Sequence, residues 1–353
     1  MVSIGKYPEI GSEFHWMGFP QGPFLAWPNP YQMFATAREA LLCLLRYLRY
    51  NSENRLFVPE YFCDEIVTWW EKKGIVISRY ADGPHLTSPE WNTVAVSQGD
   101  VVLVVNYFGV QEGMIWNKWR EANKGVLLVE DHSHDPFSGW ATESNADFAF
   151  ASLRKIFPVP DGAILWSPKQ LSLPKEPLMG DCTGSALKLA AMILKKDYLD
   201  DLDVELKEVY RCFQGQGELM LGKDHSPAVS PWSRFLLASG LPIAWREQRK
   251  NNVKTLLRLI AACPSIKPLF TKWPESNCPF NVVLLFSSKK DRNKYRSRLI
   301  EAGIYPAVHW EQRNSYNQNI LDLSNLIMTI PADHRYGEED MKYIASILLD
   351  TND

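Results

Sequence analysis

Short apolar segments that alternate with helix-like segments constrain the fold of this chain more than any other feature. Val101 to Asn106 reads VVLVVN and Val126 to Glu130 reads VLLVE, a pattern typical of strands buried on both faces. Other strands are predicted at Leu56–Pro59, Ile75–Ile77, Asp147–Ala151 and Ala163–Trp166, and helices at Thr36–Tyr50, Asp64–Lys73 and Trp116–Asn123. Such an alternation predicts an α/β fold with a mainly parallel sheet between helices. Ligands of these folds bind outside the carboxyl ends of the strands.

The second half of the chain is predicted to be more helical and to end in a smaller α/β unit. Helices are predicted at Ser185–Phe213, Ile243–Ala262, Asp291–Ala302 and Glu338–Leu349, strands at Phe280–Phe286 and Leu326–Ile330, and a polar loop at Gly215–Pro231. The first 30 residues carry Gly, Pro and aromatics without a clear period. We therefore predict an N-terminal arm at 1–30, a large domain at 31–225 and a small C-terminal domain at 226–353.

Composition narrows the partners that this chain can have. A net charge of −3 and the lack of a polybasic run argue against a nucleic-acid surface. Six scattered cysteines form no CxxC pair, which argues against a structural zinc site or a disulfide framework. No signal peptide is visible, and no apolar run reaches the roughly 20 residues that cross a bilayer. We expect a cytoplasmic protein without nucleic-acid or membrane partners.

Reactive side chains gather where predicted strands end and where the first helix begins. Asp131 ends the strand VLLVE and His134 follows it in the loop, within the stretch VEDHSHD. Ser152 and Lys155 follow the next strand, DFAFA. Thr36, Ala37 and Arg38 open the first helix, where free backbone N–H groups and the helix dipole favour a phosphate.

A phosphate site, a shielded acid and a lysine together point to pyridoxal 5'-phosphate (PLP). The aldehyde of PLP needs an amine to form an imine, which Lys155 can supply. Its ring nitrogen must stay protonated, and a carboxylate such as Asp131 raises the pKa of that nitrogen. Ser152 can add a donor to the phosphate, and Tyr61 or Phe62, placed after the strand LFVP, can stack on the ring.

Several of these segments resemble the DegT-type sugar aminotransferases, a family of fold-type I PLP-dependent enzymes. The resemblance is carried by VEDHSHD, ASLRKIFPVPDGAIL, ATAREALLCLL and VPEYFCDEIVTWWEKKGI, and near the end by LIEAGIYPAVHW and IMTIPADHRYGEEDMKYIASIL. It implies a large domain with a sheet of the seven-stranded type, a smaller α/β domain and a homodimer. It also implies the transfer of an amino group from an amino acid, such as glutamate, to a keto group of a nucleotide-linked sugar.

Carried over to this sequence, the resemblance implies a role for each matched residue. Lys155 binds the aldehyde and moves the proton, Asp131 pairs with the ring nitrogen and His134 bonds to the phenolic oxygen. The phosphate is expected at Ser152, Thr36, Ala37 and Arg38. We expect Tyr107 and His309 to contact the substrate.

Two other interpretations remain open at this level. Asp131, His132, His134 and Asp135 could hold a metal, with a further ligand from His225, His309 or His334. The same PLP site could instead serve a lyase, a dehydratase or a racemase, or a binding protein without catalysis. A lyase would form product without an amino donor, and a binding protein would show no turnover.

Overall fold

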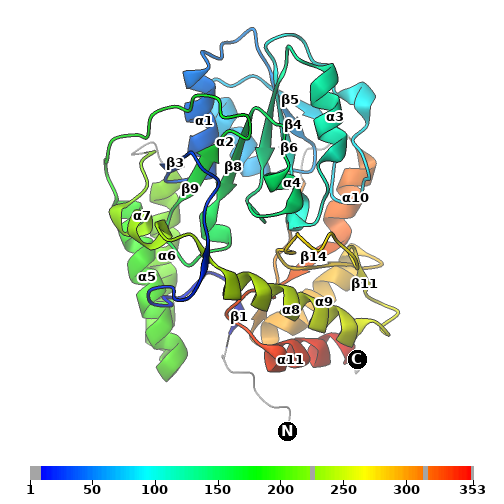
Figure 1. Ribbon diagram of the computed structural model, residues 1–353. Coiled ribbons are helices and arrows are strands. Elements are labelled where there is room, and N and C mark those ends of the chain that lie inside the picture. The colour runs from blue at the N-terminus through cyan, green and yellow to red at the C-terminus, as the bar shows by residue number, and fades with distance from the viewer. Residues whose placement is uncertain (1–8, 223–226, 313–316, 351–353) are drawn as a thin grey trace.

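A seven-stranded sheet forms the centre of the larger part of the molecule (Figure 1). The computed structural model describes residues 9–222, 227–312 and 317–350. Across the sheet the strands follow the order β3 (Tyr31–Phe34), β9 (Ala163–Trp166), β8 (Phe148–Ser152), β7 (Leu127–Asp131), β6 (Val101–Val105), β4 (Leu56–Pro59) and β5 (Ile77–Tyr80). The last five strands in this order pair in parallel, and β9 runs antiparallel to both of its neighbours. The predicted α/β fold with a mainly parallel sheet is confirmed.

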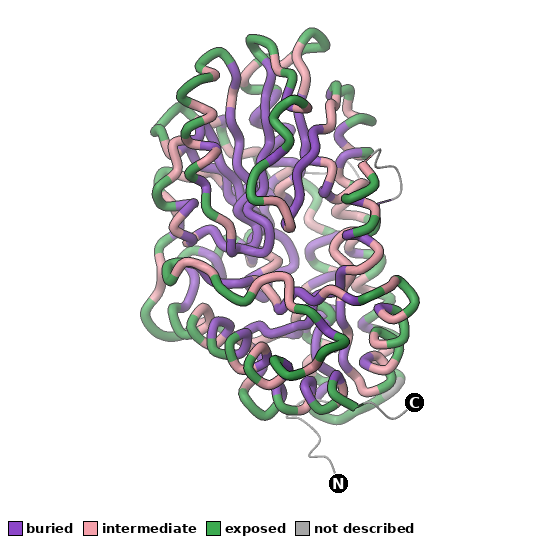
Figure 2. Tube along the Cα trace, turned by 90° about the vertical axis from the view of Figure 1, so that its right-hand side faces the viewer, coloured by how far each residue is buried: buried purple, intermediate pink, exposed green. Residues whose placement is uncertain are grey.

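Strand β6 shows why the sheet is covered on both faces. Val101, Leu103 and Val105 belong to the hydrophobic core that contains α1 (Ala37–Tyr47) and α2 (Asp64–Lys72). Val102 and Val104 belong to a second core, with Trp116 of α3 (Met114–Ala122). Successive side chains of a strand point to opposite faces, so the run VVLVV must be apolar throughout. Figure 2 shows the strands as the buried centre of this part of the molecule.

One strand, β5, begins later in the sequence than predicted. The prediction for β5 began at Ile75, whereas the strand occupies Ile77–Tyr80. The backbone N–H of Ile75 instead donates to the carbonyl of Trp70, which closes the turn after α2. Gly74 makes this turn possible with a φ of 82°, a value that other residues rarely adopt.

The segment after β9 forms two long antiparallel helices where one helix and a loop were predicted. Helix α5 (Thr183–Asp201) turns at Leu202 into α6 (Val204–Gly222). The polar loop predicted from Gly215 is therefore wrong over its first part. A Cβ at Gly217 would lie 2.8 Å from the carbonyl oxygen of Gly184, so glycine here permits close contact between the two helices. Packing has overridden the low helix propensity of glycine.

The C-terminal part is built around a small sheet with helices against it. The order is β11 (Lys267–Pro268), β12 (Val282–Leu285) and β14 (Ile327–Ile330), with helices α8 (Ile243–Ile260), α9 (Lys289–Glu301), α10 (Gln318–Leu326) and α11 (Glu338–Leu349). The N-terminal arm joins this part, because β1 (Ile10–Gly11) pairs in parallel with β13 (Ile304–Tyr305). Helix α10 was not predicted. The short elements β2 (Phe24–Leu25), β10 (Leu241–Pro242), α4 (Gly139–Thr142) and α7 (Pro231–Leu237) complete the fold.

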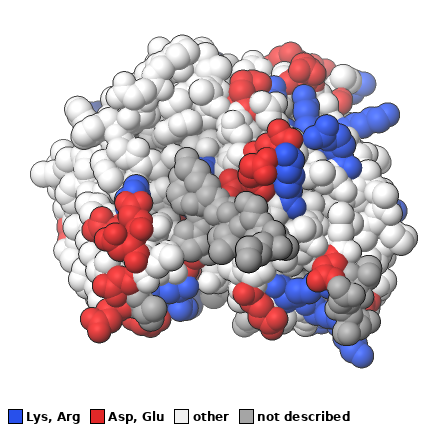
Figure 3. Space-filling model, turned by 90° about the horizontal axis from the view of Figure 1, so that it is seen from below, with Lys and Arg blue, Asp and Glu red and all other residues white. Residues whose placement is uncertain are grey.

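The surface agrees with the small net charge of the chain. Figure 3 shows acidic and basic side chains next to one another on the lower face of the molecule. Neighbouring charges of opposite sign weaken the long-range field on this face. Within the described residues, no helix is long and apolar enough to cross a bilayer.

Candidate active site

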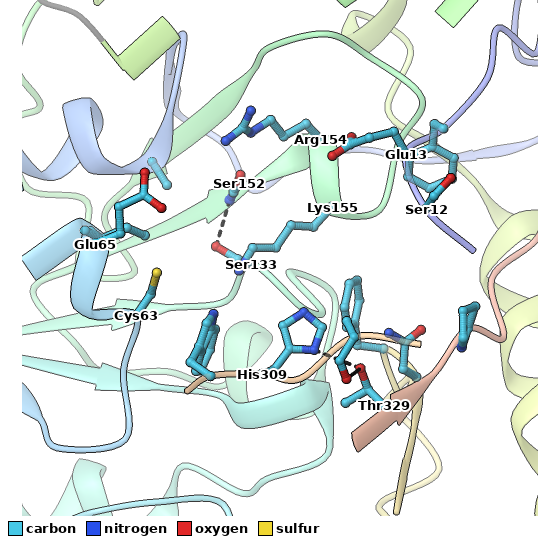
Figure 4. Close-up of a pocket in the computed structure, with 18 of the residues that line it drawn as sticks. Ser12, Glu13, Cys63, Glu65, Ser133, Ser152, Arg154, Lys155, His309 and Thr329 are labelled. Atoms are coloured by element: carbon cyan, nitrogen blue, oxygen red, sulfur yellow. Dashed lines mark hydrogen bonds between the residues drawn. The ribbon is translucent and has the colours of Figure 1, made fainter. Parts of the chain in front are cut away.

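A cavity of about 710 Å³ lies at the carboxyl edge of the large sheet. Asp131 is the last residue of β7 and Ser152 the last of β8, and Lys155 ends the short 3₁₀ turn that follows. The start of α1, the N-terminal arm and the small C-terminal sheet provide the other walls. The predicted residues that line the cavity are Thr36, Ala37, Arg38, Phe62, Asp131, Ser152, Lys155 and His309. In Figure 4, Lys155 reaches into the pocket from one wall and His309 lies on the opposite wall.

Lys155 is held among aromatic rings close to an acid. Its Nζ lies 3.5 Å from Nε2 of His134 and 5.7 Å from the centre of the Trp310 ring. Burial lowers the pKa of the Lys155 amine, and the charge of Asp131 acts in the opposite direction. A lowered pKa increases the fraction of neutral amine, the form that attacks a carbonyl group.

Asp131 is oriented by the backbone around it. Its Oδ1 accepts the N–H of Ser133 at 2.8 Å, and its carbonyl oxygen accepts the N–H of Asn106 from the end of β6. Only 7% of Asp131 is exposed to solvent. A carboxylate shielded in this way can stabilise a protonated ring nitrogen more strongly than it could in water.

His134 has a defined tautomer. Its Nδ1 accepts the backbone N–H of Phe108 at 3.0 Å, so a neutral ring carries its proton on Nε2, the atom that faces Lys155. Burial lowers the pKa of His134 well below its usual range, and the charge of Lys155 adds to this effect. The ring stacks on Phe280 at 4.5 Å. His134 does not line the large cavity itself, but its Nε2 can donate toward a group bound beside Lys155.

The metal interpretation receives no support from the histidines. His132 is fully buried, and its Nε2 lies 2.8 Å from Oε2 of Glu130, so it is a structural residue in the core. Asp135 pairs with Arg246 at 2.7 Å. In the part of the chain that the structure describes, no group of three His, Cys, Asp or Glu residues could hold a metal ion. His225 lies outside the described residues.

The start of α1, where the phosphate is predicted, borders the cavity and already uses some of its hydrogen-bonding groups. The hydroxyl of Thr36 accepts the N–H of Glu39 and donates to Glu39 Oε2, so the Thr36 side chain caps the helix. Arg38 donates from Nη2 to the carbonyl of Leu221 at 2.9 Å, and its Nε is buried with no partner among the described residues. The N–H of Ser152 is already used by Ser133 Oγ at 2.9 Å (Figure 4). Since the backbone N–H of Ser152 is occupied, Ser152 can bind an anion only through its hydroxyl.

Two predicted contacts do not reach the cavity. Tyr61 is fully buried, and its hydroxyl donates to the carbonyl of His309. Tyr107 is also fully buried and donates to the carbonyl of Tyr61 at 3.0 Å. The Tyr61 hydroxyl thus supports the loop that carries His309, and the Tyr107 hydroxyl supports the backbone of Tyr61. Phe62 forms part of the cavity wall. Tyr107 therefore does not line this cavity, and its contact with a substrate stays a prediction.

His309 is placed for contact with a bound molecule. Its Nδ1 lies 2.9 Å from the hydroxyl of Thr329, which fixes the ring. Burial lowers the pKa of His309 to about 4, with a further contribution from the charge of Lys155. The imidazole is therefore neutral near pH 7.

Several residues that line the cavity were missed by sequence reasoning. They are Ser12, Glu13 and Phe14 of the N-terminal arm, Trp310, Arg154 with Glu218, and Asp333 with Arg335. Arg335 holds both oxygens of Asp333 at 2.8 Å and donates to the carbonyl of Glu13 at 3.0 Å. The arm gave no periodic signal, so nothing in the sequence placed it against this site. Arg154 and Lys155 both line the cavity, and the only sequence signal for Arg154 was its position next to Lys155.

The pair of Asp135 and Arg246 should be a large contributor to stability. Asp135 also accepts the N–H of Cys278 at 2.7 Å, and both members of the pair are largely buried. Asp135→Ala leaves a buried guanidinium without its partner, and we expect a loss of about 3–5 kcal/mol in the free energy of unfolding. Chemical denaturation measures this loss. Asp64→Ala, which breaks a more exposed pair with Arg79, is the control and should cost less than about 1 kcal/mol. A similar small loss for Asp135→Ala would contradict the expectation.

Comparison with known proteins identifies the fold. No family model matches the chain, and no curated protein matches its sequence. Solved structures do match over 90% of the chain. They include the sugar aminotransferase CalS13 from Micromonospora echinospora (12% identity, 86% of that chain, TM-score 0.58) and PseC from Helicobacter pylori, an aminotransferase of pseudoaminic acid biosynthesis (14%, 85%, 0.60). Spr1654 from Streptococcus pneumoniae, solved in a PLP form, matches with 17% identity, 85% of that chain and a TM-score of 0.57.

The fold is that of the fold-type I PLP-dependent aminotransferases. The residues of this chain also fit that cofactor chemically. A partly buried lysine with a lowered pKa faces the same cavity as a shielded carboxylate. The start of α1 borders this cavity, and the buried Nε of Arg38 there has no hydrogen-bond partner among the described residues. Trp310 and Phe62 offer apolar surface for a planar ring.

Proposed function

We propose that this protein is a PLP-dependent aminotransferase that transfers an amino group from an amino acid to a keto group of a sugar. The observation that carries the proposal is the position of Lys155, a partly buried amine that shares one cavity with Asp131 at the carboxyl edge of the sheet. The fold shared with sugar aminotransferases supports it. We further propose glutamate as the donor and a nucleotide-linked sugar as the acceptor.

The proposed roles follow from the chemistry of each side chain. PLP supplies an aldehyde and an electron-withdrawing ring that stabilises negative charge on the carbon of a bound amine. Lys155 would hold the aldehyde through its amine, and the amino group of the donor would take the place of this amine. Asp131 keeps the ring nitrogen protonated, and the Nε2–H of His134 donates to the phenolic oxygen. Ser152, Thr36, Ala37 and Arg38 bind the phosphate at the start of α1.

Lys155 is the group that moves the proton between the donor carbon and the cofactor. Burial lowers the pKa of the Lys155 amine, which increases the fraction of neutral amine that can accept a proton. His309 has a pKa of about 4 and so stays neutral when Lys155 becomes charged. A neutral His309 can bind a substrate hydroxyl without removing the proton that Lys155 carries.

The outer part of the cavity fits a polyhydroxylated acceptor. Ser12, Glu13 and Asn281 line it together with Asp333 and Arg335. Closely spaced donors and acceptors suit hydroxyl groups, and a volume of about 710 Å³ exceeds that needed for the cofactor alone.

We also propose a cytoplasmic homodimer. Exposed apolar side chains occur at Phe19, Leu178, Met179, Leu219 and Phe235. Phe19 and Phe235 make an edge-to-face contact, so the arm and α7 share one apolar surface. Exposed apolar surface of this kind is typical of subunit contacts. Sedimentation or light scattering tests the dimer.

A spectral screen tests the proposed function. Purified protein loaded with PLP is expected to show the visible absorption band of an aldehyde held on lysine. Addition of the correct amino donor should bleach this band, and a keto sugar should restore it. Bleaching with no restoration by any keto compound, or product without an amino donor, would favour a lyase. No band and no turnover would favour a binding protein.

A further inference from the structure

A cluster of three charged residues borders the end of the cavity where α1 begins. Arg154 donates to both carboxylate oxygens of Glu218, from Nη1 at 2.7 Å and from Nη2 at 2.9 Å. Lys188 of α5 donates to the same carboxylate. Burial raises the pKa of Glu218, but Arg154 and Lys188 together hold it well below its usual range. Glu218 is therefore ionised at any physiological pH, and one carboxylate faces two cations.

This cluster lies next to the proposed phosphate site. The end of α6, which carries Glu218, contacts the start of α1 because Arg38 donates to the carbonyl of Leu221. Arg154 and Glu218 line the same cavity as Thr36, Ala37, Arg38 and Ser152. Figure 4 shows Arg154 and Ser152 on one wall of the pocket. The guanidinium of Arg154 thus lies in the same cavity as this helix start, where Glu218 now occupies it.

We propose that Arg154 is a ligand of the cofactor phosphate and that Glu218 is its displaceable counter-ion. The proposal rests on the proposed function, since it assigns a residue to the phosphate of PLP. A phosphate accepts the same two-point hydrogen bonds from a guanidinium as a carboxylate does, so the two anions compete for Arg154. Like charges also repel, so bound phosphate disfavours Glu218 in its present position.

The position of Glu218 allows it to leave. Its side chain is 43% exposed, whereas that of Lys188 is only 4% exposed. A rotamer change can therefore carry the Glu218 carboxylate into water, while Lys188 stays to offset the charge of the phosphate. The exposed side also lowers the cost of separating the pair, because water solvates the freed carboxylate.

Other acids near Arg154 are less suited to this exchange. Asp161 is fully buried and accepts hydrogen bonds from Ser230 and Ser233, which fix it in place. Glu13 influences Arg154 only through its charge and carries its own backbone contacts to Arg335. Burial raises the pKa of Glu39 to about 7, so this residue adds less negative charge to the phosphate site. Glu218 is the acid that holds the Arg154 guanidinium directly.

Comparison of PLP with pyridoxal isolates the phosphate contribution. Both aldehydes can attach to Lys155, but pyridoxal has no phosphate. With the full chain, Arg154→Gln should weaken PLP binding about 10- to 100-fold and change pyridoxal binding less than about twofold. Arg154→Lys keeps the charge without the fork and should give a smaller loss. Glu218→Gln should tighten PLP binding by about 3- to 10-fold without affecting pyridoxal.

Inorganic phosphate provides a second readout that does not depend on Lys155. The dissociation constant of phosphate, obtained from its competition with PLP, should be lower in Glu218→Gln than in the wild type. In Arg154→Gln it should be higher. Glu208→Gln is the matched control, because Glu208 lies on the same helix in an exposed pair with Arg211 and should leave both affinities unchanged.

The outcomes separate this inference from the proposed function. Equal losses for PLP and pyridoxal in Arg154→Gln would overturn it, and so would weaker or unchanged PLP binding in Glu218→Gln. Failure of the wild-type protein to bind either aldehyde would instead overturn the proposed function and this inference with it. Thermal unfolding of each variant shows whether a loss of affinity reflects a loss of fold.

Discussion

Lys155→Ala should abolish both the visible absorption band of the loaded protein and its turnover. The lysine is the proposed attachment point for PLP and the proposed proton carrier, so both properties depend on one nitrogen atom. Loss of the proton transfer alone is expected to cost about 100- to 10,000-fold in rate. Absorption spectra and turnover assays on the same preparation measure the two effects.

A comparison of lysines makes this test specific. Lys124→Ala removes an exposed lysine from the turn before β7 and should change neither the band nor the rate. Lys155→Arg keeps a positive charge but offers no amine that can form the same covalent link, so it should behave like Lys155→Ala. A visible band or full turnover in Lys155→Ala would refute the assignment of this residue.

Asp131→Asn should reduce turnover by about 100- to 1,000-fold while the covalent attachment at Lys155 persists. The amide cannot stabilise a positive charge on the ring nitrogen, and removal of one such electrostatic contribution in a shielded site costs this much in rate. The carboxylate is 7% exposed, so water cannot replace it effectively. The visible band separates this effect from a failure to bind the cofactor.

Two further measurements show whether the effect of Asp131→Asn comes from the lost charge or from a loss of stability. Asp131→Glu keeps the charge and should retain more activity than Asp131→Asn, although the longer side chain displaces the carboxylate. The hydrogen bond from the N–H of Ser133 to Asp131 Oδ1 can be kept by the amide oxygen of asparagine, so thermal stability should change little. Wild-type turnover in Asp131→Asn would show that the ring nitrogen has another partner.

The core of the sheet was predictable because its physical signal is local. The run VVLVV can be buried only if both faces of β6 are covered, and residues that alternate along it do pack in two separate cores. The same logic placed Asp131 and Ser152 at one edge, since parallel strands present their carboxyl ends together. Thr36 was also predictable, because a capping residue acts within its own helix turn.

The errors arose where packing between distant segments outweighs local preference. Glycines at 215, 217 and 222 suggested a loop, but the segment is helical, with Gly217 in close contact with α5. Tyr61 and Tyr107 looked suited to ligand contact, yet the Tyr61 hydroxyl donates to the carbonyl of His309 and the Tyr107 hydroxyl to the carbonyl of Tyr61. The chemistry of a tyrosine does not reveal whether its hydroxyl will meet a ligand or a carbonyl group.

The sequence by itself determined the parallel sheet, the helix start at Thr36 and the placement of Asp131, Ser152 and Lys155 at one edge. Each of these depends on neighbours within a few residues or on the two-residue period of a strand. Only the tertiary structure decided which distant groups complete the cavity, as with Arg154 and Glu218, which lie 64 positions apart. Their contact depends on the packing of α5 against α6 and on the hydrogen bond from Arg38 of α1 to the carbonyl of Leu221, and no short-range pattern encodes the distance between helices.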